Sequence, residues 1–279
     1  MESLSFSNTA LGCIALEMTG MILLPCIVLI IMLVKKKLIL KPMFIGAATF
    51  FVFAIILKIP LAYLLFQADN PVSYAINHNP WLYYLAASLM AGVFEETGRF
   101  IAFKVLLKKD RKPCTDLSYA LGHGGYESIY LGFSMISVLV IMIMVNNGQT
   151  DTLTQGLSPE QTKSFFSQLS PYADLSVFTA FLGIFERMCA LTIHTGLSLL
   201  VYQSVTCKTR FFLFPVAILI HSAFDFIIVF TKFGLPLFVL EMIFAVISSV
   251  VCLFAFRLAY PSGKQTDSTT PSEKGGADE

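Results

Sequence analysis

Long apolar blocks alternate with short polar connections along this chain. Seven blocks are each long enough to cross roughly 30 Å of hydrocarbon as a helix, which takes about twenty residues. The predicted spans are Thr9–Val34, Leu40–Phe66, Trp81–Leu107, Leu117–Val145, Ala173–Ser204, Phe211–Thr231 and Leu235–Tyr260. Residues 146–172 form the one long connection, which we expect to be an extramembrane loop with a short surface helix. The pattern predicts an all-α polytopic membrane bundle of about seven transmembrane helices.

Composition supports this class and excludes a soluble one. Of 279 residues, 56% are hydrophobic and only 13% are charged, whereas soluble domains carry about 25% charged residues. Nineteen Lys and Arg stand against eighteen Asp and Glu, a formal net charge of +1. This balance does not favour a nucleic-acid partner. We therefore expect a multi-pass protein of the cell membrane, surrounded by the lipid bilayer.

The basic residues fall on alternate connections and so predict the orientation of the chain. They gather at Lys35, Lys36, Lys37 and Lys41, at Lys108, Lys109, Arg111 and Lys112, at Lys208 and Arg210, and at Arg257 and Lys264. Connections rich in Lys and Arg lie in the cytoplasm. This predicts an outside N-terminus and a cytoplasmic C-terminus, with residues 1–260 forming a single transmembrane domain. Residues 261–279 lack an apolar face and are predicted to be a disordered cytoplasmic tail.

The third span contains three ionisable residues within five positions, Glu95, Glu96 and Arg99. A charged residue at the centre of a membrane helix costs about 2.5–3.5 kcal/mol, while each Leu or Phe returns only about 0.3–0.6 kcal/mol. These side chains must therefore face the bundle interior or a water-filled cavity. Ionisable residues in such places are functional candidates by default.

Three further spans carry the same kind of residue. They contain His123 and Glu127, then Glu186, Arg187 and His194, then His221 and Asp225. His123 with Glu127, and His221 with Asp225, are spaced i and i+4, so each pair projects from one helix face.

Several of these residues have similar estimated depths in the membrane. At about 1.5 Å per residue from the cytoplasmic ends, Glu96, Glu127, His194 and His221 lie roughly 15–16 Å deep, and His123 about 9 Å. This predicts one composite site, slightly toward the cytoplasm. Glu186 and Asp225 come out deeper, at roughly 27 and 21 Å, which favours supporting or structural roles for them and for Arg187.

Paired carboxylates and histidines in a low-dielectric site can hydrolyse a peptide bond. A glutamate can take a proton from water while histidine N–H groups stabilise the oxyanion that forms on the attacked carbonyl. Arg99, one turn from both acids, can fix their orientation. The sequence therefore predicts an intramembrane endopeptidase acting on a membrane-associated peptide or protein, with Glu95, Glu96, His123 and His221 as catalytic residues and no required cofactor.

Other hydrolase signatures are missing from the sequence. It contains no H-E-x-x-H helix, no G-x-S-x-G elbow, no Walker loop and no Gly-x-Gly-Asp. Ser198 or Ser222 could serve as a nucleophile, although small polar residues in spans more often serve packing. The glycines that flank His123 allow either close helix packing or a local gap for substrate entry.

The ordered motifs resemble those of the YhfC-type membrane peptidases. The resemblance is carried by Glu95-Glu96-x-x-Arg99, Gly122-His123-Gly-Gly-x-Glu127, Glu186-Arg187 with His194, and His221-x-x-x-Asp225. This group is similar in turn to the CAAX proteases and bacteriocin-processing enzymes, the glutamic intramembrane proteases. The resemblance implies that Glu95 activates water and that the histidines bind the oxyanion. Two residues, instead of that family's usual three, separate Glu96 from Arg99, and Tyr119 replaces its usual Phe.

Three alternatives stay open at this stage. His123, His194 and His221 could hold zinc with an open position for water, which would make the protein a metalloprotease. Buried acids and histidines on several helices could instead relay protons in a transporter. A catalytically silent helper protein could keep the same architecture.

Overall fold

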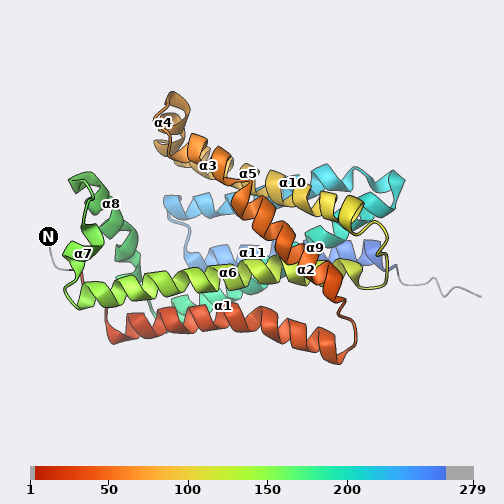
Figure 1. The fold of residues 1–279 in the computed structure, drawn as a ribbon, viewed down its shortest axis with the longest axis horizontal. Helices are drawn as coiled ribbons and strands as arrows, with labels where there is room; N and C mark the ends of the chain where they lie inside the picture. Colours follow the sequence, from red (N-terminus) through yellow and green to blue (C-terminus); the bar gives the residue numbers. More distant parts are fainter. Residues whose placement is uncertain (1–3, 262–279) are drawn as a thin grey trace, which may run out of the picture.

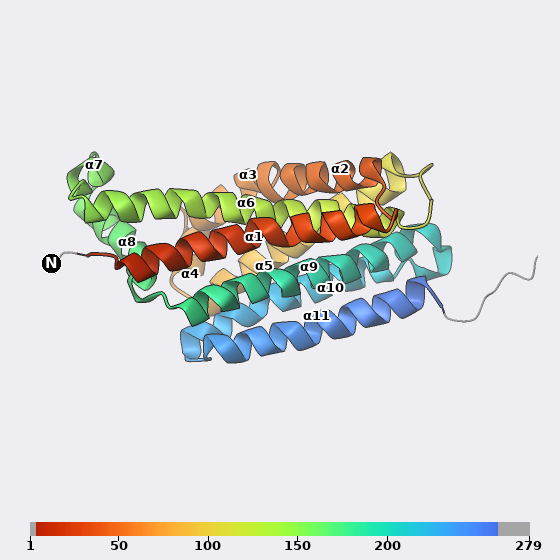
Figure 2. The same cartoon turned by 90° about the horizontal axis from the view of Figure 1, so that it is seen from below.

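The computed structural model describes residues 4–261, and every regular element in this range is helical. The long helices run lengthwise beside one another, as Figures 1 and 2 show. The α-helices are α1 (Asn8–Val34), α2 (Leu40–Thr49), α3 (Ile59–Phe66), α4 (Pro71–Asn77), α5 (Pro80–Ile101), α6 (Thr115–Asn146), α7 (Thr150–Thr154), α8 (Pro159–Leu169), α9 (Val177–Thr206), α10 (Leu213–Phe226) and α11 (Leu237–Ala259). The all-helical prediction is confirmed.

Six helical stretches of the described residues are long and apolar enough to cross a membrane. They are Asn8–Val34, Leu40–Phe66, Thr115–Asn146, Val177–Thr206, Lys208–Phe233 and Leu237–Ala259. The third predicted span corresponds to α5, whose Glu95, Glu96 and Arg99 lower its hydropathy. Helix α5 packs along α10 inside the bundle. The count of seven spans and their direction across a membrane stay predictions, as does the single domain.

Side-chain caps begin several of the long helices. The Ser7 hydroxyl accepts a hydrogen bond from the Ala10 N–H at 3.1 Å at the start of α1. Asn79 caps α5 in the same way, just before Pro80, and Ser176 forms a capping box with Thr179 at the start of α9. These residues satisfy backbone donors that a helix leaves unpaired at its first turn.

The four basic connections lie at one end of the bundle. The turns after α1 and α9, the loop between α5 and α6 and the end of α11 are together on the right in Figures 1 and 2. Residues 147–176 lie at the opposite end, where the structure has α7, α8 and a 3-10 turn at Ser170–Asp174. Phe165 and Phe166 of α8 pack against Phe6 and Met142 there. We name these two ends the basic end and the opposite end.

Two features of the helices were not predicted. The second span is divided by a π-helical segment at Phe50–Ile56, and a second π-helical segment, Ala102–Leu106, continues α5. No residue of α3 is buried, and α3 and α4 project away from α6 (Figure 1). The polar connection predicted after Phe66 contains the short helix α4. The predicted tail, 261–279, lies outside the described residues from 262 onward.

Candidate functional site

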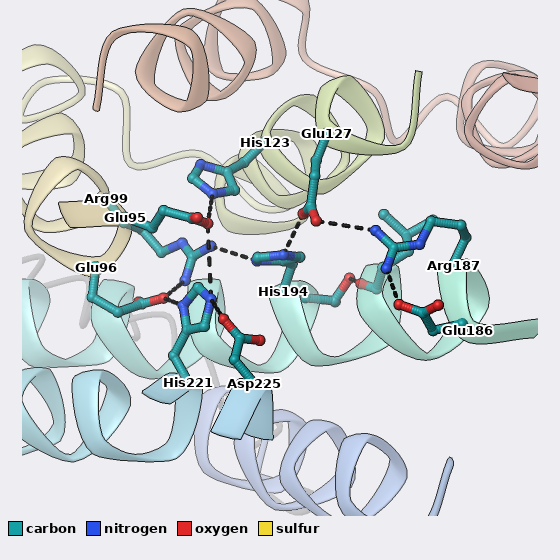
Figure 3. Close-up of polar contacts among 12 residues, drawn as sticks. Glu95, Glu96, Arg99, His123, Glu127, Glu186, Arg187, His194, His221 and Asp225 are labelled. Atoms are coloured by element: carbon teal, nitrogen blue, oxygen red, sulfur yellow. Dashed lines mark hydrogen bonds and ion pairs between the residues drawn. The ribbon is translucent and has the colours of Figure 1, made fainter. Parts of the chain in front are cut away.

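Ionisable side chains from four helices meet in the interior of the bundle (Figure 3). Helix α5 supplies Glu95, Glu96 and Arg99, α6 supplies His123 and Glu127, α9 supplies Glu186, Arg187 and His194, and α10 supplies His221 and Asp225. The structure thus brings all ten of the predicted site residues into one connected cluster.

Glu95 lies at the centre of the cluster. Its Oε2 atom is 3.2 Å from His123 Nε2 and 3.9 Å from His221 Nε2. The side chain is buried, and part of it lines a cavity. Because a carboxylate is an acceptor only, the close contact with His123 requires the proton on His123 Nε2.

Glu96 and Arg99 form an ion pair that is fully buried, with 0% exposure on both side chains. Glu96 Oε1 also lies 2.7 Å from His221 Nδ1. The carboxylate accepts this hydrogen bond, so His221 carries a proton on Nδ1 and turns Nε2 toward Glu95 and toward Asp225 Oδ2 at 3.5 Å. Glu96 therefore fixes both the orientation and the tautomer of His221.

His194 is held from two sides. The guanidinium of Arg99 donates to His194 Nδ1 at 3.1 Å, and Glu127 Oε2 lies 2.6 Å from His194 Nε2. An arginine cannot accept a hydrogen bond, so Nδ1 is the acceptor in this arrangement. Arg99 thus joins Glu96 of α5 to His194 of α9.

Glu186 and Arg187 are joined to the same cluster through Glu127. Arg187 donates to Glu127 Oε1 at 3.1 Å and pairs with Glu186 on its other side. The side chain of Glu186 is more exposed than those of Glu127 and Arg187. The pair therefore lies at the edge of the cluster.

A cavity of about 300 Å³ adjoins the cluster. Its ionisable lining residues are Glu95, Glu127, Glu186, Arg187, His194, His221 and Asp225, and the rest of the lining is mainly aromatic and apolar. Glu96, Arg99 and His123 do not line it and lie behind Glu95 and His221. Ser198 and Ser222 are buried and do not line it either, so the geometry does not favour a serine nucleophile.

Close packing between helices explains the glycines beside His123. A side chain at Gly122 would overlap the main chain of Met43 on α2, and one at Gly124 would crowd His194 on α9. Helix α6 continues without interruption through this region. Gly122 and Gly124 therefore bring α6 close to α2 and α9. Gly122 and Gly125 also line an apolar cavity of about 170 Å³ shared with α1 and α2.

Sequence reasoning did not identify the neutral residues that shape the cavity. Tyr83, Tyr84 and Ser88 of α5 and Ala190 of α9 line it beside the ionisable groups. Their spacing gives one signal, since Ala190 lies between Arg187 and His194 at helical intervals that share a face. Such small and aromatic residues are common in membrane helices, so sequence alone does not distinguish them from packing residues.

Three groups come close enough to hold a metal ion together. Glu95, His194 and His221 each offer a ligand atom, and these atoms lie within 4.8 Å of one another. Two imidazoles and one carboxylate form a donor set typical of catalytic zinc sites. The zinc alternative from sequence named His123 with His194 and His221. His123 contacts Glu95, and its ring centroid lies 5.2 Å from that of His194, but it is not one of the three groups.

The fold and the site define a polytopic helical membrane protein with a buried acid–histidine centre. A family model described as "YhfC intramembrane metalloprotease" matches residues 20–249, and the chain belongs to that family, as its motifs indicated. A curated relative, "Uncharacterized membrane protein YhfC" of Bacillus subtilis (strain 168), is 34% identical over 191 residues, which cover 67% of this chain and 71% of the relative. No solved structure matches the chain significantly.

Proposed function

We propose that the protein hydrolyses a peptide bond of a membrane-associated peptide or protein at the cluster around Glu95. The observation that carries this proposal is the convergence of Glu95, His194 and His221 on one cavity inside a membrane bundle. Membership of an intramembrane metalloprotease family supports the same reaction class.

We further propose that Glu95, His194 and His221 hold a divalent metal ion, with zinc as the best match to these donors. A bound zinc ion would polarise the scissile carbonyl and make water more acidic. This ligand set differs from the zinc alternative raised from the sequence, which had His123 in place of Glu95. Orientation of ligand histidines by carboxylates is typical of such centres, and Glu96 and Glu127 contact His221 and His194 in this way.

The remaining residues take roles that follow from their positions. Asp225 faces the cavity, and its side chain is 37% exposed, so it is the best-placed group to accept a proton from water. Arg99 neutralises Glu96, and Arg187 neutralises Glu127 and Glu186. His123 donates to Glu95 from behind and acts as a positioning residue.

A metal-free mechanism is the second candidate, and one contact favours it. The Arg99 guanidinium lies 3.1 Å from His194 Nδ1, where it occupies a nitrogen and adds positive charge beside the proposed metal ligands. In that mechanism Glu95 takes the proton from water, and N–H groups of the histidines stabilise the oxyanion.

Metal content and peptide cleavage measured on the same purified protein separate the two mechanisms. With a metal centre, we expect about one metal ion per chain, loss of cleavage on chelation and recovery on adding zinc. His221→Gln should lower both metal content and cleavage. Ser222→Ala, one position further along α10 and outside the cavity, is the matched control. Full cleavage by metal-free protein would establish the glutamate mechanism instead.

A further inference from the structure

The cavity beside Glu95 extends in one direction only. On α5 its lining residues Tyr84 and Ser88 precede Glu95, and on α9 Ala190 precedes His194. On α10, Asp225 follows His221. Because α5 and α9 run toward the basic end and α10 runs away from it, all these positions lie on the side of the opposite end (Figure 2).

A closed apolar layer separates the cluster from the basic end. It consists of Phe103, Leu107, Tyr119, Leu197 and Val201, each at most 2% exposed and all part of one core cluster. Phe103 and Leu107 follow Glu96 in the chain, Leu197 and Val201 follow His194, and Tyr119 precedes His123. We name these five residues the apolar layer. None of these five residues lines the cavity beside Glu95.

Aromatic residues surround the open side at the bundle end. Trp81, the second residue of α5, stacks on Phe233 at 4.8 Å between ring centroids, with Phe230 beside it at 5.7 Å. Tyr83 lines the cavity just after Trp81 and is 39% exposed. Trp and Tyr concentrate at membrane–water interfaces, so the opening lies near an interface and not at the centre of the bilayer.

We propose that water and substrate reach Glu95 only through the opposite end, and that this end faces the outside of the cell. The basic connections all lie beyond the apolar layer, and connections rich in Lys and Arg are cytoplasmic. The depth estimate from sequence placed the site slightly toward the cytoplasm, but the closed layer lies on that side. The part of this inference that concerns substrate rests on the proposed function, whereas the part that concerns water does not.

This arrangement defines a substrate class. The scissile bond belongs to the outer portion of a membrane-anchored peptide or protein, or to a peptide that arrives from outside. A cytoplasmic peptide would have to cross the apolar layer, whose side chains are at most 2% exposed.

Cysteine accessibility tests the direction without requiring catalysis. Ala190→Cys places a thiol in the cavity, and Leu197→Cys places one in the apolar layer on the same helix. Gln155→Cys and Lys109→Cys report the opposite end and the basic end, since both residues are exposed. A membrane-impermeant thiol reagent is added to intact cells and, separately, to inverted vesicles. Labelling is compared with that of the parent chain, which has six cysteines.

We expect Ala190→Cys and Gln155→Cys to react in intact cells, at least tenfold faster than Leu197→Cys, and Lys109→Cys to react only in inverted vesicles. The proposal would be overturned if Ala190→Cys were labelled only in inverted vesicles, from both faces of the membrane, or from neither face. Labelling of Lys109→Cys in intact cells would also overturn it. Ser88→Cys on α5 is the second probe if Ala190→Cys does not accumulate. Correct labelling without any peptide cleavage would contradict the proposed function while leaving the access route intact.

Discussion

The two sides of the site differ in how much their charged side chains are exposed. Toward the basic end, Glu96 and Arg99 have no exposure and neutralise each other behind the apolar layer. Toward the cavity, the side chains of Glu186 and Asp225 are more than one third exposed. Adjacent residues on a helix point about 100° apart, which is enough to place Glu95 at the cavity and Glu96 in the closed interior. The two neighbouring glutamates therefore have different environments, one at the cavity and one in the closed interior.

The largest effect on peptide cleavage is expected from a substitution at Glu95, where the closed side and the cavity side of the site meet. Glu95→Gln keeps the shape of the side chain but removes its charge, so it weakens the proposed metal site or, in the metal-free mechanism, removes the base. Cleavage should fall by at least about 10²-fold, the lower end of what a positioned acid or base contributes. Because the residue borders a cavity, the melting temperature should change little. Initial cleavage rates and thermal unfolding in detergent check both expectations. Unchanged cleavage in a folded variant would show that Glu95 is not part of the reactive centre. Intact cellular function of Glu95→Gln would instead indicate a catalytically silent helper protein.

On the closed side, removing one partner of an ion pair should damage stability. Arg99→Met leaves the Glu96 carboxylate buried without its partner, which should cost about 3–5 kcal/mol in free energy of unfolding. The double variant Glu96→Gln with Arg99→Met should recover part of this loss, because no isolated charge remains. Denaturant unfolding in mixed micelles measures all three proteins. Equal stability of the single variant and the parent chain would refute the sealed environment described for this pair.

A smaller loss of stability is expected where α6 packs on α2. Gly122→Ala should destabilise the protein by about 1–3 kcal/mol, since a Cβ there meets the main chain of Met43. Gly12→Ala is the matched control, because nothing lies within 4 Å of its added Cβ. Alanine is the better helix former, so Gly12→Ala should be neutral or stabilising. Equal responses of the two variants would argue against close packing at Gly122.

The smallest effect is expected at the exposed edge of the open side. Glu186→Gln should reduce cleavage by less than about tenfold, because exposed ion pairs contribute little and Arg187 keeps its contact with Glu127. Glu127→Gln, which disturbs His194 directly, should cost more. Cleavage rates of the two variants at equal protein concentration test this order. A reversed order would place the reactive centre nearer Glu186.

Hydropathy predicts the helices because each long apolar block must satisfy its backbone inside the bilayer. Leu117–Val145 was predicted where α6 spans Thr115–Asn146. The prediction began the fifth span at Ala173, whereas α9 begins at Val177, because residues 170–174 form a 3-10 turn. The π-helical segment at Phe50–Ile56 left no signal, since its residues are as apolar as those around it.

The convergence of the ionisable side chains was predictable, but their internal arrangement was not. Charge in a membrane helix is costly enough that Glu95, His123, His194 and His221 had to be buried together. Which of them face the cavity depends on helix rotation and on packing by neutral residues such as Ala190. A depth estimate carries no information on rotation, so it could not distinguish Glu95 from Glu96 or locate the opening.

Hydrolysis and transport make opposite predictions for one experiment on purified protein in sealed vesicles. A library of fluorogenic, membrane-associated peptides is presented to the wild-type chain with and without zinc, and cleavage and proton uptake are recorded together. The account predicts peptide cleavage that is lost in His221→Gln, with no proton-coupled uptake. Proton-coupled uptake of a solute with every peptide left intact would contradict it.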